Sequence, residues 1–175
     1  MKNIWWFVGA LTGMTLVFLI VLIQKLSGEK TGEYDERQVA ARGVAYKYGF
    51  FAVIIYELFY GTLAAAGIQW VDAAFGALLG IFIGATVFGV TAIAKDAFIS
   101  QRETPGKTTV TLALILAYNL LAGIHKLLRG EAIVDGMLTF EAVNLVCAAM
   151  FLIVGIAGLI HWLKQRGQRE EERLD

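Results

Sequence analysis

Five apolar segments, each close to the length of a membrane crossing, constrain this chain more than any other feature. They cover residues 4–23, 48–67, 73–94, 110–127 and 140–163, and polar segments separate them. A helix needs about 20 mainly apolar residues to cross the hydrocarbon core of a bilayer. Because lipid offers no hydrogen bonds to the backbone, only helices and closed barrels cross it. The pattern predicts an all-α fold, a polytopic membrane bundle of five transmembrane helices.

Composition agrees with a single integral membrane domain over residues 1–175. The mean hydropathy is +0.65, and only 17% of the residues are charged. The formal net charge is zero, so the chain lacks the overall basic field that attracts nucleic acid. Cys147 is the only cysteine, which excludes an intrachain disulfide and a multi-cysteine metal site. We expect the lipid bilayer as a partner, no nucleic acid and no cofactor.

The distribution of positive charge predicts an orientation. Segments 24–47, 95–109 and 164–175 hold 12 of the 15 Lys and Arg residues. The alternate segments hold the remaining 3, one of which is Lys126 at the end of the fourth span. The positive-inside rule places the three basic segments in the cytoplasm. The N-terminus is then outside and the C-terminus is in the cytoplasm, with residues 129–136 in an outer connection.

Two parts of the chain resemble each other. Residues 56–61 (YELFYG) and 118–123 (YNLLAG) share the pattern Y-x-L-x-x-G. Self-similarity at a fixed spacing is typical of repeat architectures. We interpret residues 48–103 and 110–170 as two copies of a helical hairpin with the same orientation, a parallel repeat about an axis along the membrane normal.

Glu57 is the only acidic or basic residue deep within a predicted span, and the repeat aligns it with Asn119. A charged side chain at the bilayer centre costs roughly 2.5 to 3.5 kcal/mol. One interpretation is an ion or proton site. The other, which we favour, is a polar contact between helices, in which Glu57 hydrogen-bonds with Asn119, Thr12 or Thr15.

Small residues recur along two spans. Gly76, Gly80 and Gly84 repeat every four residues in the third span, and Gly9 and Gly13 form a G-x-x-x-G pair in the first. Such a glycine zipper lets another helix approach closely. The approaching helix belongs either to the same chain, which we favour, or to a second copy in a homo-oligomer.

The sequence carries no catalytic motif. Residues 105–109 (PGKTT) lack the earlier Gly of a phosphate-binding loop, because Gln101 stands in its place. His125 and His161 fall near opposite membrane faces and do not readily share a metal ion. We therefore expect no enzymatic activity, no catalytic residues and no metal site.

A charged segment precedes the second span. It contains no Pro, so one helix is expected over residues 34–66, with roughly 20 Å of it projecting from the membrane. The positive-inside rule explains the basic residues of this segment, but it does not explain the acidic ones. We predict that its acids and bases pair and hold the helix to neighbouring cytoplasmic helix ends. These residues are Glu33, Asp35, Glu36, Arg37 and Arg42.

Residues 34–38 (YDERQ), Arg42 and residues 46–51 (YKYGFF) resemble uncharacterised small bacterial integral membrane proteins that carry an Asp-Glu-Arg motif before a membrane helix. The resemblance implies a multi-pass protein of the bacterial cytoplasmic membrane and brings no established chemistry.

Two functions stay open from the sequence. The first, which we favour, is an accessory or interaction protein whose charged cytoplasmic helix engages a protein partner or another copy of the chain. The second is a small transporter or channel component with a mid-membrane polar site at Glu57 and Asn119.

Overall fold

A computed structural model describes residues 34–100 and 105–171, together with five positions nearer the N-terminus, which are Thr12, Thr15, Phe18, Leu19 and Leu22. The chain divides into two units, residues 1–33 and residues 34–175. In the first unit the five described residues are α-helical and exposed. Gly9, Gly13 and Glu33 lie outside the described residues.

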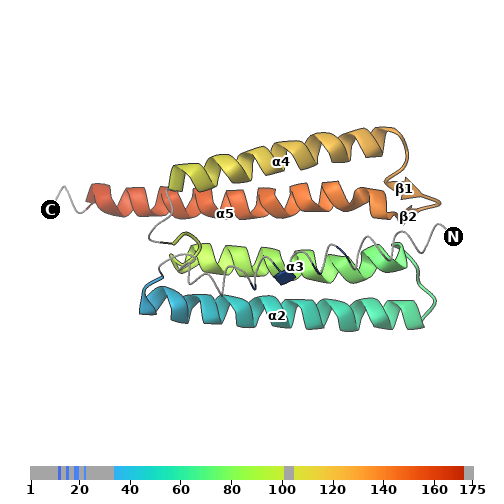
Figure 1. The fold of residues 1–175 in the computed structure, drawn as a ribbon, viewed down its shortest axis with the longest axis horizontal. Coiled ribbons are helices and arrows are strands. Elements are labelled where there is room, and N and C mark those ends of the chain that lie inside the picture. Colours follow the sequence, from blue (N-terminus) through green and yellow to red (C-terminus); the bar gives the residue numbers. More distant parts are fainter. Residues whose placement is uncertain are drawn as a thin grey trace. The chain divides into compact units, whose positions relative to one another are not determined.

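Four long helices make up the second unit (Figure 1). They are α2 (Glu36–Ala65), α3 (Ala73–Ala94), α4 (Pro105–Leu128) and α5 (Val143–Glu171). All four are long and apolar enough to cross a membrane. The predicted all-α, multi-pass membrane protein is therefore confirmed at this level. The first predicted span, residues 4–23, lies mostly outside the described residues, so the count of five spans stays a prediction.

The helices differ in length from the predicted spans. α3 coincides with the predicted residues 73–94, whereas α2, α4 and α5 continue beyond the apolar segments into polar sequence. α2 begins at Glu36, as expected for one continuous helix through the charged segment. Helices extend past the apolar residues because the end of a helix is set by capping groups rather than by hydropathy.

Capping side chains mark where the helices begin. Asp35 Oδ1 accepts a hydrogen bond from the Gln38 backbone N–H at 2.6 Å, and Gln38 Oε1 accepts from the Asp35 N–H at 3.4 Å, which completes a capping box. Asp72 accepts from the Ala74 N–H at 2.9 Å at the start of α3. Gly67, with a φ of 76°, ends α2 in the left-handed conformation that glycine adopts readily.

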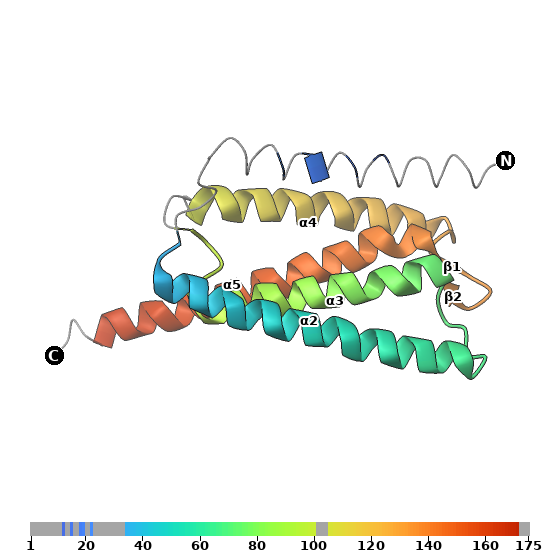
Figure 2. The same ribbon diagram turned by 60° about the horizontal axis from the view of Figure 1, so that its bottom comes forward.

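The four helices form two antiparallel hairpins, α2–α3 and α4–α5, which run in the same direction along the bundle (Figure 1). α3 packs against α5, so the order across the bundle is α2, α3, α5, α4 (Figure 2). The end that carries the start of α2 and the end of α3 is called the Asp96 end below. The opposite end, with the connections 66–72 and 129–142, is called the hairpin end.

A β-hairpin lies in the connection between α4 and α5, and the sequence analysis did not predict it. β1 (Ile133–Val134) pairs antiparallel with β2 (Met137–Leu138). The turn between them is Asp135-Gly136, with φ values of 50° and 76°. Positive φ at both central residues is the mark of a type I′ turn, for which Asp-Gly between apolar residues is a strong signal.

The β-hairpin ties the two connections of this end together. The Leu138 N–H donates to the Trp70 carbonyl at 3.0 Å, and the Leu138 carbonyl accepts from the Asp72 N–H at 2.7 Å. The buried apolar core lies beside these bonds, where the fully buried Phe75 ring meets the edge of Phe140 with centroids 6.0 Å apart. The start of α3 is thereby attached to the α4–α5 hairpin.

Glycines of α3 allow α2 to approach closely. A Cβ atom on Gly76, Gly80 or Gly84 would overlap a side chain of α2, namely Tyr60, Glu57 and Val53 in that order. At one point the two backbones meet, since a Cβ on Gly49 would lie 2.9 Å from the Gly84 carbonyl oxygen. The sequence left two partners open for this glycine face, a helix of the same chain or a second copy. In the structure, α2 of the same chain packs there. A contact with a second copy stays a prediction.

Replacing Gly49 with Ala should destabilise the bundle by about 1–3 kcal/mol, because the added methyl group meets backbone and not a mobile side chain. Gly43→Ala is the matched control on the same helix, since nothing lies within 4 Å of a Cβ there. The control should be neutral, or stabilising by up to about 1 kcal/mol through helix propensity. Thermal unfolding in detergent micelles measures both variants. Equal unfolding temperatures would contradict the close contact.

Candidate functional site

α3 ends at the Asp96 end in a Schellman turn. The Asp96 N–H donates to the Ile93 carbonyl at 3.0 Å, and the Ala97 N–H donates to the Ala92 carbonyl at 2.8 Å. Asp96 has a φ of 55° at the position that glycine usually occupies in this motif. The left-handed conformation costs a residue with a Cβ roughly 1–2 kcal/mol. Other contacts of Asp96 must offset that cost.

Two side chains of α5 contact the Asp96 carboxylate. His161 Nε2 and Gln165 Nε2 each lie 2.7 Å from Asp96 Oδ1. The two α5 side chains also contact each other, with 3.0 Å between Gln165 Nε2 and His161 Nε2. Side chains four residues apart project from the same face of a helix, so both contact the same oxygen of Asp96. These contacts join the end of α3 to α5.

Gln38 of α2 binds the same turn through backbone carbonyls. Its side chain is 8% exposed, although it lies in a segment rich in charge. Gln38 Nε2 donates to the Asp96 carbonyl at 2.9 Å and to the Ile99 carbonyl at 3.3 Å. Gln38 Oε1 accepts from the Asp35 N–H in the capping box. Both polar atoms of the buried amide therefore have partners, as buried polar groups require.

Arg42, one turn further along α2, makes a third contact. Arg42 Nη1 donates to the Ala97 carbonyl at 3.0 Å and to the Tyr34 hydroxyl at 3.1 Å. Its guanidinium carbon lies 4.3 Å from the centroid of the Tyr34 ring and 5.3 Å from that of Phe88. A cation over an aromatic face gains about 0.5 to 2 kcal/mol, more when it is desolvated.

Together, Gln38 and Arg42 bind three carbonyls of one turn, those of Asp96, Ala97 and Ile99. We call this arrangement the carbonyl clasp. All three residues follow α3, which ends at Ala94, so their carbonyls lie outside the hydrogen-bond pattern of the helix. The clasp supplies donors from a neighbouring helix, and it fixes the start of α2 to the end of α3.

The predicted charged motif takes several separate roles. Asp35 caps α2, and Arg42 reaches a neighbouring helix end through a carbonyl rather than a carboxylate. Glu36 and Arg37 are exposed, and no ion pair involves them among the residues that the structure describes. Gln38, whose role was not predicted from the sequence, makes the buried contact. Its one sequence signal is its place three residues after Asp35, where a capping box needs Gln or Glu.

Glu57 and Asn119 are not brought together. Glu57 lies on α2 with Oε1 against Gly80 of α3. Asn119 lies on α4, and its Nδ2 donates to the Ile115 carbonyl of its own helix at 2.9 Å. α3 and α5 lie between these two helices in the packing order (Figure 2). The contact of Glu57 with Thr12 or Thr15 stays a prediction, because the threonines belong to the first unit.

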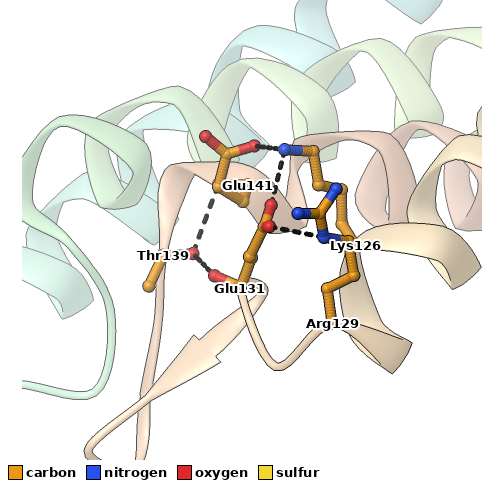
Figure 3. Close-up of polar contacts among 5 residues, drawn as sticks. All are labelled: Lys126, Arg129, Glu131, Thr139 and Glu141. Atoms are coloured by element: carbon orange, nitrogen blue, oxygen red, sulfur yellow. Dashed lines mark hydrogen bonds and ion pairs between the residues drawn. The ribbon is translucent and has the colours of Figure 1, made fainter.

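A second polar cluster lies at the hairpin end (Figure 3). Lys126 Nζ lies 2.6 Å from Glu131 Oε2 and 2.9 Å from Glu141 Oε2, and Arg129 Nε lies 2.9 Å from Glu131 Oε1. Thr139 Oγ1 donates to the Glu131 carbonyl at 2.5 Å and accepts from the Glu141 N–H at 3.3 Å. The cluster joins the last turn of α4 to the short 3-10 helix Phe140–Ala142, which directly precedes α5, across the β-hairpin connection.

The electrostatics of this cluster favour an ionised Glu131. The hydrogen bond from Lys126 lowers the pKa of the Glu131 carboxyl below its ordinary value, and the charge of Arg129 acts in the same direction. Exposed ion pairs contribute little to overall stability. Their effect here is local, on the docking of the β-hairpin connection.

Among the described residues, no group of three or more His, Cys, Asp and Glu side chains is placed to hold a metal ion. Comparison of the chain with protein-family models, with curated proteins and with solved structures found no match. The geometry of the chain itself is then the basis for a functional assignment.

Gln38→Ala should destabilise the protein by about 1–3 kcal/mol, because it removes two hydrogen bonds, to the Asp96 and Ile99 carbonyls, each worth about 0.5–1.5 kcal/mol. Arg37→Ala is the matched control, one residue earlier and exposed. A surface substitution of that kind should change stability by no more than about 0.5 kcal/mol. Unfolding midpoints in micelles provide the measurement. If the two variants lose the same stability, the carbonyl clasp is not what holds α2.

Acid should loosen the β-hairpin connection. The lowered pKa of Glu131 means that its contribution is present above the unfolded-state value, about 4.3 for Glu, and is lost as pH falls through the folded-state pKa. Exchange of the Leu138 amide hydrogen, corrected for the intrinsic effect of pH, should therefore speed up under acid. Glu131→Gln should remove this dependence, whereas Asp135→Asn in the adjacent turn should keep it. Unchanged protection of Leu138 throughout would contradict the role of Glu131.

Proposed function

We propose that this protein is a non-enzymatic accessory or interaction protein of a membrane, which presents charged helix ends at the Asp96 end to a protein partner or to another copy of itself. The observation that carries the proposal is the carbonyl clasp. Gln38 and Arg42 fix the first turns of α2 to the end of α3, while the adjacent Glu36 and Arg37 stay exposed. Charges on an already ordered backbone lose little conformational freedom when a partner binds.

The end of α5 adds to this surface. α5 continues to Glu171, past its apolar part. Arg166 lies 5.6 Å from the centroid of the Trp162 ring and pairs with Glu170 at 3.2 Å. Alternating charges of this kind set the orientation and specificity of a contact more than its affinity. A partner with a complementary charge pattern fits such a surface.

In this proposal the Asp96 end faces the cytoplasm. Segments 24–47, 95–109 and 164–175 hold 12 of the 15 Lys and Arg residues, which supports this orientation through the positive-inside rule. Residues 4–23 form a further span before the four helices, which brings the total to five. The N-terminus is then outside and the C-terminus is in the cytoplasm. The resemblance of the Asp-Glu-Arg segment supports a bacterial cytoplasmic membrane.

We further propose that the two hairpins are a parallel repeat. They run in the same direction, and the aligned helices α3 and α5 pack against each other. Contact between equivalent helices is what a pseudo-twofold axis along the membrane normal produces.

The alternative is a small transporter or channel component with a polar site at Glu57 and Asn119. The two residues lie on helices that α3 and α5 separate, and the Asn119 amide donates within its own helix. Of this pair, Glu57 alone remains a candidate for binding an ion in the membrane.

A photo-crosslinking amino acid in place of Val39 tests the proposed function in intact cells. The Val39 side chain is 58% exposed beside Glu36 and Arg37, and Ile133, 50% exposed at the hairpin end, is the matched control position. We expect a crosslinked product from position 39, and its mass distinguishes a second copy from another protein. Exchanging the two charges (Glu36→Arg with Arg37→Glu) should lower the yield up to about fivefold, since an exposed pair contributes up to about 1 kcal/mol. A yield that is insensitive to the exchange, or equal at position 133, would count against the proposal.

A further inference from the structure

We propose that the carboxyl group of Glu57, held against Gly80 of α3, is a proton-binding site within the membrane. This inference is independent of the proposed function, because it concerns the apolar part of α2 and not the helix ends at the Asp96 end. The balanced step is the addition of one proton to one carboxylate oxygen, with no oxidation or reduction. Four observations lead to it.

The first observation is the isolation of Glu57. Between Lys47 and Asp72 it is the only Asp, Glu, Lys, Arg or His, and α3 contains none of these residues. A charge at the bilayer centre costs several kcal/mol unless it is paired or hydrated. α2 packs on α3, and no charged residue of α3 is available to balance the carboxylate.

The second observation is the place that the carboxyl group occupies. A Cβ atom on Gly80 would overlap Glu57 Oε1 and would lie 2.9 Å from the Tyr56 ring. Gly80 is buried, and Glu57 is half-buried. The missing side chain at position 80 therefore leaves a recess in α3, lined by Tyr56, that accommodates the carboxyl group.

The third observation concerns the hydroxyl groups beside it. Tyr56 and Tyr60 are the other titratable residues on this part of α2. The Tyr56 hydroxyl donates to the Gly76 carbonyl at 2.8 Å, and the Tyr60 hydroxyl donates to the Ala73 carbonyl at 3.3 Å. Each phenol has a single proton, so neither donates to Glu57. Within residues 34–100 and 105–171, no hydrogen bond or ion pair to Glu57 is found.

The fourth observation selects the proton over a metal cation. A bare cation such as Ca²⁺ takes about six to eight oxygen ligands. Glu57 offers two oxygens, and the nearby carbonyls of Gly76 and Ala73 already accept hydrogen bonds from the tyrosines. A proton needs one oxygen atom, and it removes the charge entirely.

The test uses the full chain in phospholipid vesicles and dicyclohexylcarbodiimide, an apolar reagent that adds to protonated carboxyl groups in membranes. Mass spectrometry of the peptide that contains Glu57 measures the addition. We expect modification of Glu57 that decreases as the pH is raised, because the reactive form is the protonated one. Glu131 and Glu141, ion-paired at the hairpin end, are internal controls that should stay unmodified.

Three variants keep the test decisive. Gly80→Ala fills the recess, so modification at Glu57 should change several-fold in rate. If that variant fails to fold, Glu57→Asp, which shortens the side chain by one methylene group, replaces it and should show the same sensitivity. Glu57→Gln should abolish the modification while leaving the crosslink from position 39 intact, which separates this inference from the proposed function.

Three results would overturn the proposal. One is no modification of Glu57 in vesicles at any pH, although the detergent-denatured chain reacts. The second is protection by Na⁺ at constant pH, which would assign a metal cation instead. The third is a rate that neither recess variant alters, which would show that the surroundings of Glu57 do not form a site.

Discussion

The bundle depends on hydrogen-bond donors for the carbonyls at the end of α3 and in the turn that follows it. A membrane helix that ends near the hydrocarbon leaves C-terminal carbonyls without partners in the helix, and each unsatisfied group there costs several kcal/mol. The turn at Asp96 satisfies two carbonyls with its own N–H groups. α2 supplies donors to the following residues through Gln38 and Arg42. The position of α2 along α3 follows from this requirement.

The same requirement explains why a charged segment precedes the apolar part of α2. Asp35 starts α2 and, through the capping box, holds the Gln38 side chain in place. The amide can then reach the turn at the end of α3, and Arg42 reaches it one turn later. One short segment therefore both begins a helix and docks it. Glu36 and Arg37 do neither, and both are exposed.

α3 is the central element, held at both ends. At the hairpin end it is fixed by the bond between Asp72 and Leu138 and by the buried Phe75. At the other end Asp96 connects it to α2 and α5. Side chains held by packing and hydrogen bonds on regular elements are the most precisely positioned ones. Glu57 lies against this helix, with its carboxyl group at Gly80.

By itself, the sequence determined the membrane class, the bounds of α3 and the continuous helix through the charged segment. These features depend on local composition and capping, which act whatever the neighbouring helices do. Only the tertiary structure decided that Gln38 is buried, that Arg42 binds a carbonyl and that Glu57 and Asn119 lie apart. Those contacts depend on which helix faces meet. In a membrane the hydrophobic effect does not choose between apolar faces, so close packing of residues such as Gly49 and Gly84 makes that choice.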